Sequence, residues 1–137
     1  MKHLVVATAA LALAAVPALA SEATFDKTLQ VNGRVELSVS TGSGNIHLTR
    51  GSDNQVHIYG WVKSNWGGSE EQVREIAAHP PIEQTGSIVR VGADQQNLHN
   101  ISIEYDVQAP AKTFLDASSG SGDVTDEGVG VNARLNT

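Results

Sequence analysis

The feature that most constrains the fold of this chain is a corner sequence that occurs twice. Residues 41–46 read Thr-Gly-Ser-Gly-Asn-Ile, and residues 119–124 read Ser-Gly-Ser-Gly-Asp-Val. Because glycine adopts backbone conformations that other residues avoid, such corners suit tight reversals between strands. Residues expected to face inward lie at the same three distances, or offsets, before the first glycine of each corner. They are Val35, Leu37 and Val39 before the first corner and Thr113, Leu115 and Ala117 before the second. The repeat predicts an all-β fold of the β-solenoid or stacked-hairpin type.

A third copy of these offsets lies at the end of the sequence. Val131, Ala133 and Leu135 match the inward positions, and their corner would begin immediately after Thr137. We therefore expect residues 21–137 to form a single β-repeat domain that is incomplete at its C-terminus. A last strand over 129–137 would present unpaired backbone groups, so we expect either edge-strand self-association through it or disorder of this strand.

Alternation of apolar and polar side chains, typical of half-buried strands, covers most of the chain. It predicts strands at 27–31, 35–40, 46–48, 56–62, 87–91, 100–107, 113–117 and 129–135. The dipeptide Asn32-Gly33 predicts a hairpin turn, and Gly60 predicts a bulge.

One stretch departs from the strand pattern and predicts a short helix at about 69–78. Ser69 and Gln72 fit a capping box, with Ser69 as the N-cap. Val73, Ile76 and Ala77 form a narrow apolar stripe, and the prolines at 80 and 81 end the helix.

The N-terminal twenty residues read as a secretory signal peptide. A basic start at Lys2 precedes an apolar run from Leu4 to Ala15, which is too short to span a membrane. Small residues then provide a cleavage site after Ala20, so we expect a mature chain with no transmembrane segment. The chain is expected to be exported, to the periplasm or the cell surface of a bacterium.

Composition excludes several classes of protein. The chain contains no cysteine, which excludes a disulfide scaffold and a cysteine zinc site. Removing Lys2 with the leader leaves eight Lys and Arg against fifteen Asp and Glu, a net charge of −7. A protein that binds nucleic acid or an anionic membrane uses Lys and Arg side chains to replace the counterions of that partner. Neither is therefore an expected partner of this acidic chain.

The two corners, together with the stretches at 25–31, 69–92 and 101–110, resemble one group of proteins. It is the bacterial β-strand-repeat proteins of unknown function that carry the label adhesin, and the resemblance covers essentially the whole mature chain. It implies an all-β, solenoid-like fold in exported or envelope-associated proteins without a defined enzymatic activity. Members of the group usually continue through more Gly-Ser-Gly turns, which also favours a truncated chain here.

The Gly-Ser-Gly corners allow two ligand readings, both weaker than a structural turn. A phosphate loop needs a following helix, whereas strands are expected here. A calcium roll uses Gly and Asp in its turns, which makes Asp123, Asp126 and Glu127 weak candidate ligands. Such rolls repeat every nine residues, which this sequence does not, so we expect no metal and no cofactor.

Two histidines are a second weak metal candidate. If the strands at 46–48 and 56–62 form a hairpin with Ile46 opposite Ile58, then His47 lies opposite His57 on the outer face. Cross-strand neighbours have Cβ atoms about 5 Å apart, close enough to share a metal. No third ligand is identifiable, so two exposed histidines are the favoured reading.

No catalytic constellation is identifiable, and we expect a protein that is not an enzyme. Glu104 and Asp106 share a strand face, where solvated outer positions explain them better than a carboxylate pair. Tyr59 and Trp61 face outward and suit binding to a sugar or a protein partner. The favoured alternative is that the helix at 69–78 covers them.

Together these features predict an exported binding or structural module of the cell envelope, with an envelope protein or a glycan as its partner. The alternatives are a carbohydrate-active hydrolase and an envelope-stress sensor that acts through protein contacts.

Overall fold

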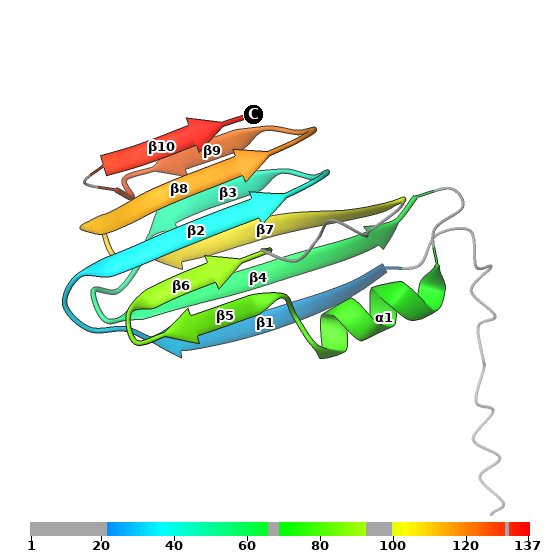
Figure 1. Cartoon of the computed structure of the whole chain (residues 1–137), viewed down its shortest axis with the longest axis horizontal. Coiled ribbons are helices and arrows are strands. Elements are labelled where there is room, and N and C mark those ends of the chain that lie inside the picture. The colour runs from blue at the N-terminus through cyan, green and yellow to red at the C-terminus, as the bar shows by residue number, and fades with distance from the viewer. Residues whose placement is uncertain (1–21, 66–68, 93–99, 131) are drawn as a thin grey trace, which may run out of the picture.

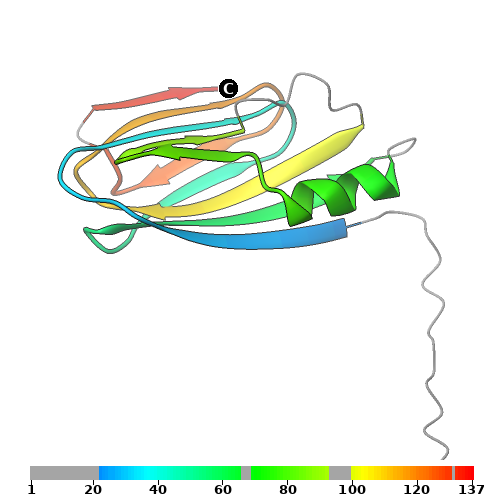
Figure 2. The same cartoon turned by 60° about the horizontal axis from the view of Figure 1, so that its bottom comes forward.

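The strands form two open sheets that pack face to face, with one short helix beside them (Figures 1 and 2). The computed structural model describes residues 22–65, 69–92, 100–130 and 132–137. The predicted leader at 1–20 and Val131 lie outside these residues. The all-β prediction is confirmed at the level of fold class, and both sheets contain parallel as well as antiparallel strand pairs.

Each sheet has five strands, which do not follow one another in chain order. Sheet A contains β1 (Glu22–Gln30), β4 (Gln55–Ser64), β7 (Ile101–Ala109), β3 (Ile46–Arg50) and β9 (Val124–Glu127), in that spatial order. Sheet B contains β10 (Asn132–Asn136), β8 (Thr113–Ser119), β2 (Val35–Thr41), β6 (Ile88–Val91) and β5 (Ile82–Thr85).

A single apolar core fills the space between the sheets. Alternate residues of each central strand face it, as in β2, where Val35, Leu37 and Val39 are buried and the residues between them are not. The largest buried side chain is that of Tyr105 on β7, whose ring meets Phe25 edge-on at 6.1 Å. The period-two pattern therefore identified the core-facing positions of the central strands correctly. It was wrong for Ala133 and Leu135, which it also places inward, because both are exposed on a strand at the edge of the sheet.

The two Gly-Ser-Gly corners carry the chain from sheet B to sheet A and stack on each other. The first joins β2 to β3, and the second joins β8 to β9. The amide of Gly44 donates to the carbonyl of Ser121 at 2.9 Å, and the Ser119 hydroxyl donates to the carbonyl of Gly44 at 2.8 Å. The Asn45 side chain accepts from the amide of Asp123 at 2.9 Å. The corners are thus paired backbone to backbone.

The strands on either side of the corners pair so that positions of equal offset lie opposite each other. On β2 and β8 the inward residues of equal offset face each other across a parallel pair, with Leu37 opposite Leu115. On β10, Leu135 lies opposite Ala117 in the same way. The last strand begins at Asn132 instead of Val129, because residues 128–130 form a loop in which Val129 is buried. Among the described residues β10 is an edge strand, and self-association through 129–137 stays a prediction.

The predicted helix is confirmed as α1 (Glu70–Ala78). The Ser69 side chain accepts a hydrogen bond from the amide of Gln72 at 3.3 Å, as a capping residue does. Val73 is fully buried in the shared core, and α1 packs against β1 and β4.

Both predicted hairpins are wrong. The turn at Asn32-Gly33 does not pair β1 with β2, because these strands lie in different sheets. The strands β3 and β4 do not pair either, because β7 lies between them in sheet A. Alternation indicates which residues face inward. It does not distinguish a strand that pairs with the preceding strand in a hairpin from a strand that crosses to the other sheet.

Gly60 is not at a bulge, because the pairing of β4 with β1 runs through it without interruption. Gly60 lies opposite Phe25, whose ring occupies the space that a side chain at position 60 would take. Two short strands, β5 and β9, were not predicted, because their residues are mostly polar and show little alternation.

Candidate functional site

The outer face of sheet A is polar, with two exposed aromatic side chains at its centre. Tyr59 and Trp61 lie two residues apart on β4 and are 38% and 36% exposed. Across the antiparallel pair with β7, Tyr59 lies opposite Asp106 and Trp61 lies opposite Glu104. The two carboxylate residues therefore stand beside the aromatic pair on the next strand.

These four side chains border a shallow hollow of about 230 Å³. His47 and Asn45 line its other side, the first on β3 and the second in the first Gly-Ser-Gly corner. The floor is the sheet itself at Tyr105, whose side chain points into the core. We call this set the sheet A site: Asn45, His47, Tyr59, Trp61, Glu104 and Asp106.

Trp61 is held in place by a cation. The ammonium of Lys63 lies 3.6 Å from the centroid of the indole ring and 3.6 Å from a carboxylate oxygen of Glu104. Lys63 lies two residues from Trp61 and therefore on the same face of β4, so the alternation along β4 could have predicted that Lys63 lies near the site. The contact of β4 with β7 that brings Glu104 there could not be read from alternation.

His47 lies between two carboxylates. Its Nε2 is 3.3 Å from Glu127 on β9, and its Nδ1 is 4.0 Å from Asp106 on β7. The predicted pairing of His47 with His57 is wrong, because His47 lies opposite Asp106 and Thr125. His57 instead approaches Asp26 at 2.6 Å.

The candidate metal ligands do not converge. Asp126 accepts a hydrogen bond from the amide of Val129 at 3.0 Å, Glu127 contacts His47, and Asp123 uses its amide to bind Asn45. Within the described ranges no three His, Asp or Glu side chains form a group that could hold a metal ion.

The structure corrects the favoured reading of the aromatic pair. We expected the helix to cover Tyr59 and Trp61, but both remain exposed. Val73 of α1 is buried in the core, which places the helix against the inner side of sheet A. The outward parity of the two aromatic residues is confirmed.

The Gly-Ser-Gly corners are followed by strands, as expected for structural turns. The amides of Gly44 and Ile46 donate to carbonyl groups of the second corner at 2.9 Å. These amides are therefore engaged in the pairing of the corners and are not directed at an anion.

The sheet A site offers three chemical functions side by side. The aromatic faces provide apolar surface, the carboxylates and the Asn45 carbonyl oxygen accept hydrogen bonds, and the neighbouring Lys63, which contacts Trp61 and Glu104, donates them. Such a combination binds ligands that have both apolar faces and hydroxyl groups.

Comparisons of the chain with protein-family models, with curated proteins and with solved structures give no match. In the part of the chain that the structure describes, no helix has the length and apolar character needed to cross a membrane.

Proposed function

We propose that this chain is an exported, non-enzymatic binding module of the bacterial cell envelope, and that the sheet A site binds a glycan. The observation that carries the proposal is the exposure of Tyr59 and Trp61 beside a hollow lined by hydrogen-bonding groups. Exposed apolar surface that is contiguous and rimmed by polar groups marks interaction sites.

A sugar ring has the chemistry that this surface complements. Its C–H face packs on an aromatic ring, while its hydroxyl groups form hydrogen bonds around the edge. Glu104 and Asp106 stand where they can accept from such hydroxyl groups, and Asn45 can both donate and accept. The contact with Lys63 fixes the orientation of the indole before the ligand arrives, which reduces the entropy cost of binding.

Export and the type of fold are part of the same proposal. The predicted leader at 1–20 supports export to the periplasm or the cell surface. The stacking of the second Gly-Ser-Gly corner on the first supports a solenoid-type β repeat. The resemblance to the adhesin-type β-strand-repeat proteins agrees with an envelope location.

A hydrolase is the second candidate, because Glu104 and Asp106 both border the hollow. Glycosidases use two carboxyl groups that flank the scissile bond. Here both carboxylates leave the same strand two residues apart, and Glu104 is engaged with Lys63. This arrangement favours binding over cleavage.

The proposal is tested by affinity electrophoresis in gels that contain soluble polysaccharides, with pull-down on insoluble peptidoglycan and chitin. We expect retardation or capture by at least one glycan. Trp61→Ala and Tyr59→Ala should each weaken it about tenfold, because buried aromatic side chains dominate such interfaces. Leu135→Ala, which removes an exposed apolar side chain from sheet B, is the matched control and should bind as the wild type does.

Two results would change the assignment. Failure to bind any glycan, with capture of an envelope protein that depends on Tyr59 and Trp61, would favour the sensor alternative. Release of reducing sugar from a bound glycan, abolished by Glu104→Gln or Asp106→Asn, would establish the hydrolase.

A further inference from the structure

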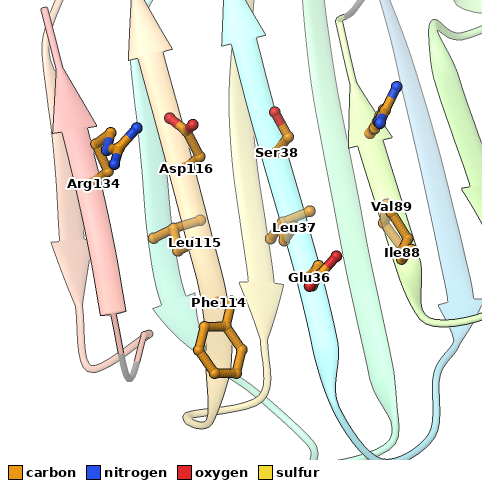
Figure 3. Close-up of a pocket in the computed structure, with 10 residues that line it drawn as sticks. Glu36, Leu37, Ser38, Ile88, Val89, Phe114, Leu115, Asp116 and Arg134 are labelled. Atoms are coloured by element: carbon orange, nitrogen blue, oxygen red, sulfur yellow. The ribbon is translucent and has the colours of Figure 1, made fainter.

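The outer face of sheet B carries a larger hollow, of about 550 Å³, on the opposite side of the molecule from the sheet A site. It lies over β10, β8, β2 and β6, and none of its residues was a candidate site residue in the sequence. Figure 3 shows Arg134, Asp116 and Ser38 side by side on three neighbouring strands, with Phe114 and Glu36 further along two of them. The small side chain of Ser38 leaves the centre of this face open.

The charges on this face follow a regular order across the sheet. One row, set by the strand register, runs Arg134 on β10, Asp116 on β8, Ser38 on β2, Arg90 on β6 and Glu83 on β5. The signs along it are positive, negative, neutral, positive and negative. If a second copy of the row is laid over the first in reverse order, with Ser38 over Ser38, each charged residue lies opposite a residue of the other sign.

The charges of this row are not used within the chain. Among the described residues, none of the four charged side chains has an ion-pair partner within 4.0 Å. The neighbouring row contains Phe114 and Ile88, which is 42% exposed, on either side of Glu36. The face therefore combines unpaired charges with apolar side chains placed symmetrically about β2.

We propose that this face binds a second copy of the chain, related by a two-fold axis that runs along β2. Such an axis reverses the order of the strands and keeps each row opposite itself, as an isologous interface requires. Asp116 then meets Arg90 of the partner copy, and Arg134 meets the partner copy's Glu83. Phe114 meets the partner copy's Ile88, so the apolar side chains cover each other.

The remaining groups fit this pairing. The long side chain of Arg90 from the partner copy lies over β8, next to the space that Ser38 leaves open. Glu36 lies near the axis and would approach its own copy, but Arg34 stands 3.7 Å from it and screens its charge. The guanidinium of Arg34 also lies over the Phe114 ring at 4.1 Å, which fixes the aromatic side chain.

The size of the face sets the expected strength of association. Five strands spaced by about 4.8 Å and roughly 15 Å long cover on the order of 350 Å². This is below the roughly 800 Å² per partner of a standard interface. The dimer is therefore weak and forms between micromolar and millimolar concentrations.

Sedimentation equilibrium over that concentration range tests the proposal, with the full chain expressed from its own leader and purified after export. Packed sheets are rotated by about 30° relative to each other, so the pairs nearest the axis keep the closest register. Arg90→Asp and Asp116→Arg each create two like-charge contacts per dimer, and each should weaken association at least about tenfold.

The double variant Arg90→Asp/Asp116→Arg restores opposite charges across the axis. It should recover most of the association; the swap also puts like charges beside Arg134 and Glu83 within each sheet, so recovery is expected to be partial. Asp53→Arg, in the exposed turn before β4, makes the same change of charge away from the face and should have no effect.

Circular dichroism of each variant verifies that the fold is kept. A wild type that stays monomeric at millimolar concentration would overturn the proposal. So would a dimer that is indifferent to Arg90→Asp, because association through the β10 edge would behave in that way.

Discussion

The two glycines of the first corner differ sharply in what they tolerate. Gly44 has φ +130°, and a Cβ atom there would collide with the carbonyl of Ile103. Gly122 has φ +139°, and its Cβ would collide with the carbonyl of Gly44. Gly42 has no atom within 4 Å of its Cβ position. The second glycine of each corner is thus required by a close backbone contact, which Gly44 makes with β7 and Gly122 makes with the first corner.

We therefore expect Gly44→Ala to lower the free energy of unfolding by at least about 2 kcal/mol, from backbone strain and overpacking together. Gly42→Ala, two residues away, should change it by less than about 1 kcal/mol. Urea denaturation of both variants measures the difference. Equal effects of the two substitutions would contradict the close contact of Gly44 with Ile103.

Gly60 differs from the corner glycines because the group that would meet its Cβ is a side chain and not the backbone. A Cβ atom at position 60 would enter the ring of Phe25, so Gly60→Ala should cost about 1–3 kcal/mol of stability. In a Phe25→Leu background the ring is gone, and the same substitution should cost at least about 1 kcal/mol less. A double-mutant cycle in urea with no coupling would show that the two residues do not meet.

At the scale of elements, the helix was predictable and the strand pairing largely was not. The signals of α1 are local, since Ser69 and Gln72 are three residues apart and the prolines follow directly. Strand pairing depends on residues far apart, and alternation is the same whichever strand lies alongside. The repeat marked equal offsets before two equal corners, and β2 and β8 do pair in equal register. The offsets alone did not predict that these two strands lie side by side.

The cap of α1 can be measured on its own. Ser69→Ala removes the oxygen that accepts from the amide of Gln72 and should cost about 1 kcal/mol of stability. Ser69→Asn keeps an oxygen acceptor and should lie close to the wild type. A Ser69→Ala variant that unfolds at the same urea concentration as the wild type would show that the helix contributes little to the fold.

At the scale of the whole molecule, the two outer faces differ in composition. The sheet A face combines an aromatic pair with carboxylates, and the sheet B face carries the ordered row of charges. Parity along β4 placed Tyr59 and Trp61 on the surface correctly. The alternation along β4 could not predict that Glu104 lies beside them, because that contact joins strands separated by about forty residues of sequence. The sheet B face was missed because its charges form a pattern only after the strands are put in spatial order.

The predicted leader gives a test of export. We expect the protein recovered from the periplasm or the cell surface to begin at Ser21, because cleavage follows Ala20. Intact mass spectrometry of the purified protein measures this directly. A mass that includes residues 1–20 would contradict processing by a signal peptidase.

The central claim is that the sheet A site binds a glycan. An NMR titration of the ¹⁵N-labelled protein with soluble peptidoglycan fragments and with chito-oligosaccharides tests it most directly. We expect saturable shift changes at Tyr59, Trp61 and the indole N–H, extending to Glu104 and Asp106 on β7, while the amides of sheet B stay unchanged. Saturable changes confined to sheet B, or no change with either class of glycan, would contradict the claim.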